Sequence, residues 1–482
     1  KICKFSIMLL SQEEQREQFV VAYVHYENRK GKRIVSLKIS TPSEKTCECL
    51  LRVVVKKIKA KDISIECSIE NLDIFRLVDE NLLLISYSVV SKKSIAQVVG
   101  QGIKKGHFVV RPRPMIGLVC QLRYAGERVA SFVRYHLALG FDKIYLYFDD
   151  GSELEDAEIA KQEGKEKIYV RFRDLDLVNE WKLLRGYNKL APFIENDVQV
   201  RQMLNALHAF DLARREDDLD WLLHLDSDEL FYPGPGISSI RNHFAQMHAK
   251  SNCAVFTYYN FEAVPEYSSQ LSVQQKEFER SEDPFRTVSL FKRPIPCINS
   301  TQSTSEKIQK ALSFWHQRSP MGEFFLFYQN GKSAVRCSVD AVPASVHLWT
   351  PLLEHNAASK LCWTNDPRHK GVHYDSTVSC AILHFACTNA FALWQKYYTL
   401  GNFPNECVAN TVVHEPNTFH CLCRDTLVSA CASSTFDNEN DNDQGRSAMY
   451  RLFLRHVALT DATVIEEHLH AGVLERISLI SF

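Results

Sequence analysis

Up to about residue 105, the chain consists of short apolar segments that are rich in β-branched and aromatic residues and are separated by polar turns. Segments of this length and composition are typical of strands, and their close spacing favours antiparallel pairing. They cover residues 19–24, 34–39, 51–55, 63–67 and 82–89. We therefore predict a β-rich accessory domain over residues 1–105, such as a small sandwich, in which no acids, histidines or nucleophiles converge.

Beyond residue 115 the hydrophobic pattern alternates between strands and helices. Buried strands are predicted at residues 115–120, 143–148, 167–172 and 221–225, and helices at residues 128–139 and 200–215. Strands that alternate with helices pair in parallel through right-handed crossovers. The pattern therefore predicts an α/β fold whose ligands bind beyond the carboxyl ends of the strands.

Two of these strand ends carry paired acids. Asp226 and Asp228 follow the apolar run 221–225, and residues two apart on a strand point the same way. Two converging carboxylates stay ionised when a cation lies between them. We therefore expect a hard divalent ion there, with phosphate oxygens as its remaining ligands. Asp149 and Asp150 follow the strand 143–148, where an exposed carboxylate can accept hydrogen bonds from ribose hydroxyls or a base edge.

The charge balance excludes one class of partner. The 482 residues include 57 Lys and Arg against 58 Asp and Glu, so the chain lacks the basic footprint expected of a protein that binds duplex nucleic acid. A hydrophobic content of 45% and a charged content of 24% are ordinary for globular proteins. No apolar run approaches the roughly 18 residues that span a bilayer.

The sequence is compatible with more than one cellular compartment. Fifteen cysteines, an odd number, are compatible with a reducing compartment or with a few disulfides plus free thiols. The chain starts with lysine and not with methionine, so an anchor or signal can lie upstream of it. In that case we expect the Golgi or secretory lumen, with the cytoplasm as the alternative.

Several ordered motifs resemble one enzyme group. The resemblance starts with Gly126-Glu127, residues 132–150 and residues 221–229. It continues through residues 260–266, 288–292, 331–336, 346–347 and 382–385. Together these pieces cover about residues 115–400, and they resemble GT-A glycosyltransferases of the family 92 (formerly domain of unknown function 23) and family-2-like group.

The resemblance implies a fold and a division of the chain. We expect a GT-A core, which is a Rossmann-like α/β fold with a mixed, mostly parallel sheet. Residues 106–265 would form its nucleotide-sugar-binding half and residues 266–400 its acceptor-side half. Beyond the resemblance, the residue pattern of 401–482 predicts a mostly helical extension, with an acidic connector at residues 437–444 and packing helices at residues 448–456 and 465–480.

The resemblance also implies roles for individual residues. Glu127, Asp149 and Asp150 would lie beside the nucleoside, although Gly126-Glu127 stands where most relatives have Asn-Glu. Asp226 and Asp228 would bind Mn²⁺ or Mg²⁺ on the diphosphate. His384, at the end of a predicted strand over residues 379–384, would be the third metal ligand, with His347 as the rival.

The predicted function is transfer of a sugar from a nucleotide-diphosphate donor, favouring a UDP-sugar, to a hydroxyl of a glycan, glycoprotein or other acceptor. Members of family 92 suggest inversion, which requires a carboxylate to deprotonate the acceptor, and we nominate Glu262 with Glu266 second. Lys332 would contact the leaving diphosphate. The alternatives are another metal-dependent nucleotidyl or phosphoryl transferase, and an inactive relative that binds carbohydrate or a partner protein.

Overall fold

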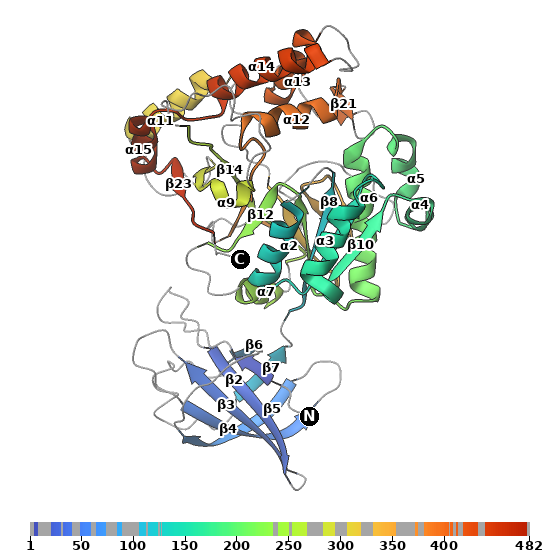
Figure 1. The fold of residues 1–482 in the computed structure, drawn as a ribbon. Coiled ribbons are helices and arrows are strands. Elements are labelled where there is room, and N and C mark those ends of the chain that lie inside the picture. The colour runs from blue at the N-terminus through green and yellow to red at the C-terminus, as the bar shows by residue number, and fades with distance from the viewer. Residues whose placement is uncertain are drawn as a thin grey trace. The chain divides into compact units, whose positions relative to one another are not determined.

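The chain forms two compact units, Lys1–Pro114 and Met115–Phe482, each of which is described by itself. The structure is a computed structural model (Figure 1). In the first unit it describes the backbone of residues 4–7, 21–29, 32–40, 49–58, 64–73, 84–88, 106–111 and residue 114. In the second it describes residues 115–123, 126, 128–234, 240–249, 253–267, 283–294, 306–319, 331–352, 372–374, 380–403, 405–407, 411–412, 418–431 and 439–479.

The first unit is a seven-stranded antiparallel sheet. Its strands are β1 (Lys4–Ile7), β2 (Val21–Arg29), β3 (Lys32–Ser40), β4 (Cys49–Ile58), β5 (Ser64–Asp73), β6 (Leu84–Ser88) and β7 (Gly106–Arg111), in the order β1-β2-β3-β4-β5-β7-β6. The antiparallel pairing was predicted, whereas the strands form one hydrogen-bonded sheet and not the two sheets of a sandwich. The boundary predicted at residue 105 is too early, because β7 pairs with β5 and β6 and completes this sheet.

The second unit is built on a mixed, mostly parallel sheet, as predicted for an α/β fold. Its strands are β8 (Ile116–Leu122), β9 (Lys143–Phe148), β10 (Ile168–Phe172), β11 (Trp221–Asp226), β13 (Val255–Thr257), β16 (Ser333–Arg336) and β19 (Val372–Tyr374). Their order is β10-β9-β8-β11-β16-β13-β19. The first four pair in parallel, and β16 runs antiparallel to both of its neighbours.

Apolar side chains on both faces of this sheet are buried under helices. Because side chains alternate along a strand, Ile144, Leu146 and Phe148 join one core cluster, and Tyr145 and Tyr147 join the other. The first cluster packs against α2 (Arg128–Leu139), α3 (Leu154–Gly164) and α7 (Ile240–Ala249). The second packs against α4 (Leu175–Trp181), α5 (Tyr187–Leu190) and α6 (Val198–Arg215).

The helix and strand positions in this region follow the hydrophobic pattern closely. The helix predicted at residues 128–139 and the strand predicted at residues 143–148 have those bounds. Gly140, with φ of 105°, supplies the left-handed conformation that ends α2. The helix predicted from residue 200 begins two residues earlier, because the Asp197 side chain accepts hydrogen bonds from the Gln199 and Val200 amides and caps it.

A second sheet begins where β11 ends. It contains β12 (Glu229–Tyr232), β14 (Tyr259–Ala263), β15 (Leu290–Lys292), β20 (Ala381–His384) and β23 (Leu474–Arg476), in the order β12-β20-β14-β15-β23. Only residues 227 and 228 separate β11 from β12. The turn that carries Asp228 therefore joins the two sheets. Two strand pairs lie outside them: β17 (Ala341–Pro343) with β18 (Trp349–Pro351), and β21 (Glu406–Cys407) with β22 (Thr411–Val412).

The C-terminal part of the second unit is mostly helical. Helices α12 (Ala390–Leu400), α13 (Phe419–Ala430) and α14 (Glu439–His456) lie together around one apolar cluster (Figure 1). Helices α11 (Glu306–Arg318) and α15 (Ala462–His470) pack on each other, and α9 (Pro284–Thr287) is a single turn. None of the helices in the described parts of the chain is long and apolar enough to cross a membrane.

Two details of this region differ from the prediction. The acidic connector expected at residues 437–444 is helical from Glu439, where α14 begins. The helix expected at residues 465–480 ends at His470, and Leu474–Arg476 forms β23 on the edge of the second sheet. Residues 115–482 also form one compact unit, so the boundaries predicted after residues 265 and 400 do not separate compact units.

We expect Gly331→Ala to destabilise the fold by about 1–3 kcal/mol, the usual cost of forcing an extra methyl group into a packed site. A Cβ at Gly331 would lie 1.5 Å from the backbone oxygen of Tyr258, so the backbone must shift. Urea unfolding measures the loss. Gly151→Ala is the matched control, because nothing lies within 4 Å of its Cβ position. Equal unfolding midpoints for the two variants would contradict the packing described here.

Candidate active site

A cavity of about 570 Å³ lies beyond the carboxyl ends of β8 and β11. Its walls come from the end of β8, the turn after β11, the start of α9 and one side of α12. The acids Asp226, Asp228 and Asp283 line it, together with the cations Arg123, Arg128 and Lys396. A concave site with opposite charges at the carboxyl ends of parallel strands is the usual place for a ligand in an α/β fold.

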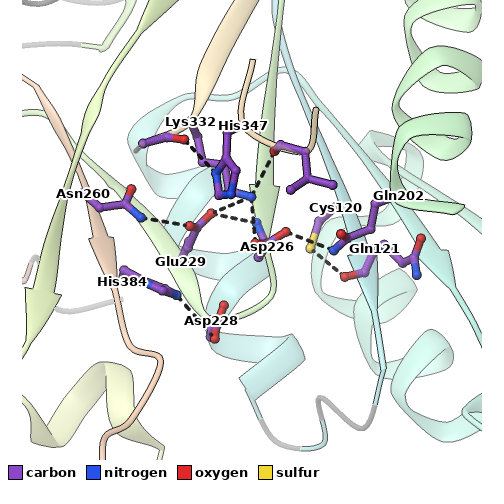
Figure 2. Close-up of polar contacts among 12 residues, drawn as sticks. Cys120, Gln121, Gln202, Asp226, Asp228, Glu229, Asn260, Lys332, His347 and His384 are labelled. Carbon is purple, nitrogen blue, oxygen red and sulfur yellow. Dashed lines mark hydrogen bonds and ion pairs between the residues drawn. The ribbon is translucent and has the colours of Figure 1, made fainter. Parts of the chain in front are cut away.

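Asp226 ends β11 and is neutralised from inside the protein. Its Oδ2 accepts a hydrogen bond of 2.7 Å from the Lys332 ammonium, and its Oδ1 accepts one of 3.1 Å from the Gln202 amide (Figure 2). Burial acts to raise the pKa of Asp226, but the charge and hydrogen bond of Lys332, together with the nearby His224, lower it below its usual range. Asp226 therefore carries its negative charge at neutral pH.

Asp228 lies in the turn between the two sheets and faces other cations. Its Oδ2 is 3.4 Å from the Lys396 ammonium and 3.7 Å from His384 Nε2. Burial again opposes ionisation, but Lys396, His384 and Arg128 together hold the pKa of Asp228 well below its usual range. Both acids that the sequence singled out thus line one cavity and are ionised.

Glu229 begins β12 and is a third, fully buried acid. Its Oε2 accepts a 2.9 Å hydrogen bond from the Asp226 amide and lies 3.7 Å from the Lys332 ammonium. Its Oε1 is 3.4 Å from the Asn260 amide nitrogen. Burial raises the pKa of Glu229 to about 7, and this effect exceeds the opposing influence of Lys332.

His384 is held in place by strand register. In the second sheet it lies opposite Glu229 on β12 and opposite Glu262 on β14. Its Nδ1 is 2.8 Å from Glu262 Oε1, so its Nε2 points towards Asp228 (Figure 2). Burial acts to lower the pKa of His384, but Glu262 and Asp228 outweigh it and raise the pKa to about 9.

The chemistry of these donors fits a divalent ion. A histidine whose second ring nitrogen is bonded to a carboxylate is the usual arrangement of metal-ligating histidines, and Asp228 supplies a carboxylate beside it. Nowhere in the described residues do three or more His, Cys, Asp and Glu side chains gather to hold a metal. The predicted set of Asp226, Asp228 and His384 is therefore not assembled, because Asp226 is engaged by Lys332 and Gln202. A metal at Asp228 and His384 would complete its shell with water and phosphate oxygens.

His347, the rival histidine, is turned away from the cavity. It is not among the residues that line the cavity, and its Nδ1 lies 3.0 Å from the Gly331 carbonyl oxygen. Burial and the nearby Lys332 lower the pKa of His347 to about 3. Of the two histidines, the structure brings only His384 close to Asp228.

Lys332 does not have the position predicted for it. Its side chain is 0% exposed, and besides Asp226 its ammonium donates a 3.1 Å hydrogen bond to the Val346 carbonyl oxygen. It lies behind Asp226 and does not line the cavity. The expectation that Lys332 contacts a leaving diphosphate is therefore wrong for this arrangement.

The acids after β9 also differ from the prediction. Asp149 is 6% exposed, and the Arg201 guanidinium donates hydrogen bonds of 2.7 Å to each of its carboxylate oxygens. It is a buried ion pair and not an exposed acceptor for a nucleoside. Asp150 remains at the surface, where the Ser152 amide donates to its Oδ1 and lowers its pKa. Glu127 lies outside the described residues, between the cavity-lining Gly126 and Arg128.

The two acids nominated as catalytic bases do not reach the cavity. Glu262 is 3% exposed and bonded to His384, and Glu266 forms a two-pronged ion pair of 2.7 and 2.8 Å with Arg476. Neither lines the cavity. Their nomination as bases is therefore wrong, and the contact of Glu262 with His384 makes it a residue that orients the histidine.

Sequence reasoning did not find the three cavity-lining cations. Arg123 follows β8 directly, so its position after a predicted buried strand was a usable signal. Arg128 begins α2, and Lys396 is the single basic residue of α12. For these two residues the sequence carried no sign of which ligand they would face.

Comparisons with known proteins give a consistent but distant likeness. No family model matches the chain. A glycosyltransferase-like protein of Arabidopsis thaliana is 25% identical over 372 residues, which is 76% of this chain and 70% of that protein. A second glycosyltransferase-like protein of the same plant is 24% identical over 247 residues, which is 49% of this chain and 43% of that protein. The resemblance to family 92 stays a prediction.

A solved structure is also similar in part. It is core-mannan synthase A of Aspergillus fumigatus in its Mn/GDP form, with a TM-score of 0.20 and 13% identity. The match covers 33% of this chain and 45% of that protein. At this level the likeness carries no argument about the site.

We expect Arg201→Met to destabilise the fold by about 3–5 kcal/mol, because it leaves the Asp149 carboxylate buried without its partner. Replacing both residues, in Arg201→Met with Asp149→Leu, should recover much of the loss because no buried charge remains. Urea unfolding of the two single variants and the double variant measures the coupling. Strictly additive losses would show that the ion pair does not operate as described.

Glu229 gives a prediction of pH dependence. Its folded-state pKa of about 7 exceeds the ordinary glutamate value of 4.5, so its contribution to stability is complete below pH 4.5 and is lost as the pH rises through 7. Glu229→Gln cannot undergo this loss. The difference in unfolding free energy between the variant and the wild type should therefore shift in favour of the variant by on the order of 1–3 kcal/mol from pH 5 to pH 8. Urea unfolding at both pH values tests this, and parallel pH profiles would contradict it.

Proposed function

We propose that this protein is a metal-dependent glycosyltransferase with a GT-A core, which transfers a sugar from a nucleotide-diphosphate donor, favouring a UDP-sugar, to a hydroxyl acceptor. The observation that carries the proposal is the cavity lined by Asp228, Arg123, Arg128 and Lys396, with an oriented His384 lying 3.7 Å behind the Asp228 carboxylate. The similarity to two glycosyltransferase-like plant proteins supports it.

The main difficulty of this reaction is the negative charge that builds up on the departing diphosphate. Arg123, Arg128 and Lys396 line the cavity and place positive charge where a diphosphate would enter. We assign Asp228 and His384 to hold Mn²⁺ or Mg²⁺, with Glu262 fixing the orientation of His384. Because its pKa is about 9, His384 would release its Nε2 proton to solvent when it binds the ion. The ion, when bound, supplies a Lewis acid that neutralises the diphosphate oxygens.

Inversion at the sugar would further require a carboxylate that accepts the proton of the acceptor hydroxyl. Among the described residues that line the cavity, Asp283 is the carboxylate that neither Lys332 nor Lys396 engages, and its Oδ2 lies 3.7 Å from Arg286 Nε. Its Oδ1 accepts a 3.1 Å hydrogen bond from the Phe285 amide and so caps α9. We therefore assign the role of base to Asp283 in place of Glu262 and Glu266.

The alternative of nucleotidyl or phosphoryl transfer with two metal ions fits the site less well. Two-metal sites need further carboxylates close to the first pair. Glu229 is the nearest candidate by sequence, but it is buried against the Asp226 amide and Lys332. Its carboxylate supports Asp226 from inside and does not line the cavity.

A screen of nucleotide sugars with Mn²⁺ tests the reaction class. Hydrolysis of one donor with release of its nucleoside diphosphate is the expected result, because water can replace the acceptor hydroxyl. Release of pyrophosphate or nucleoside monophosphate would instead support the alternative chemistry. A complete lack of turnover, together with a lack of nucleotide binding, would favour an inactive relative.

Asp228→Asn should leave the fold intact and abolish metal-dependent binding of UDP, because it removes the charged ligand without changing the size of the side chain. We expect the affinity to fall by more than the roughly 10–100-fold that loss of an outer-shell partner costs. Calorimetry with UDP and Mn²⁺ measures it, and the exposed Asp176→Asn serves as a charge-matched control. Normal binding of UDP and Mn²⁺ by Asp228→Asn would refute the assignment of Asp228.

A further inference from the structure

Two of the three acids that line the cavity, Asp226 and Asp228, are neutralised by lysines of different character. Lys332 is 0% exposed and is fixed by Asp226, Glu229 and the Val346 carbonyl oxygen. The side chain of Lys396 is 31% exposed, and its contact with Asp228 is longer, at 3.4 Å. The first lysine belongs to the core, and the second lies at the surface of the cavity.

The helix that carries Lys396 presents one side to the cavity. Residues 391, 392, 395, 396, 399 and 400 of α12 line it, a spacing that places them on one helical face. Leu393 and Tyr397 are buried against the neighbouring helices and anchor the other face. The Lys396 side chain can therefore swing along the cavity on its four-carbon stem while the helix stays in place.

Lys396 and a divalent ion would compete for the negative charge of Asp228. Lys396 neutralises it, with its ammonium 3.4 Å from Asp228 Oδ2. A divalent ion on the same carboxylate would place a second positive charge beside the ammonium. Like charges at this range repel strongly in a partly buried site.

We propose that the Lys396 ammonium pairs with the Asp228 carboxylate when no ligand is bound. When metal and nucleotide bind, it moves from Asp228 to the diphosphate. This inference rests on the proposed function and adds an exchange of ion pairs to it. Lys396 is then a competitor of the metal and a partner of the nucleotide. The exchange keeps each buried charge paired in both states, which avoids the cost of an isolated charge.

Lys396→Met should change the affinities for Mn²⁺ and for UDP in opposite directions. Without the competing ammonium, Mn²⁺ alone should bind about fivefold more tightly, which corresponds to the roughly 1 kcal/mol of a partly exposed ion pair. With saturating Mn²⁺, UDP should bind at least about tenfold more weakly, because a charge-assisted hydrogen bond to phosphate is lost. Lys396→Arg keeps the charge and should retain most of the UDP affinity.

Calorimetry of the full chain with Mn²⁺ alone, and with UDP at saturating Mn²⁺, separates the outcomes. Lys310→Met is the matched control, because it removes an exposed lysine that pairs with Glu467 in the contact between α11 and α15. It should change neither affinity. Thermal unfolding checks that each variant is folded.

Tighter Mn²⁺ binding together with weaker UDP binding in Lys396→Met supports the exchange. A variant that binds both ligands as the wild type does, or that changes both affinities in the same direction, overturns it and leaves the proposed function standing. Wild-type protein that binds neither Mn²⁺ nor UDP, nor GDP in its place, overturns the proposed function and this inference with it.

Discussion

The site depends on one buried cation. Asp226 is partly buried and Glu229 beside it is fully buried, so the two carboxylates need a counter-charge to remain ionised together. The Lys332 ammonium lies 2.7 Å from the first and 3.7 Å from the second. Lys332 directly precedes β16, which runs antiparallel beside β11, so the sheet order itself delivers the charge that its acids need.

The same principle extends into the second sheet, where charged residues lie opposite one another on adjacent strands. Glu229, His384, Glu262 and Lys292 occupy matching positions on β12, β20, β14 and β15. Negative and positive side chains alternate along this row, and Lys292 also stacks on the Trp315 ring at 4.7 Å. Burial lowers the pKa of Lys292 to about 8 even though Glu262 opposes this. Register, set by backbone pairing, thus decides which way His384 points.

Local patterns predicted local structure well, because strand and helix periodicity depend on neighbouring residues. The strand at residues 143–148, the helix at residues 128–139 and the position of Asp226 and Asp228 on the wall of one cavity followed from spacing alone. The pairing of charges did not, since Lys332 is 106 residues from Asp226, Glu262 is 122 from His384 and Arg201 is 52 from Asp149. An acid at a strand end looks the same in the sequence whether it meets a ligand or a buried guanidinium.

Helix α12 belongs to two environments at once. Its outer face is packed with α13 and α14 around Leu393, Tyr397 and Met449, and its inner face is a wall of the cavity. A change in how those C-terminal helices stack would move α12 and with it that wall. Sequence drift in a region that touches no ligand can thereby reshape the space available to an acceptor, so selectivity can evolve while the charged residues of the site stay the same.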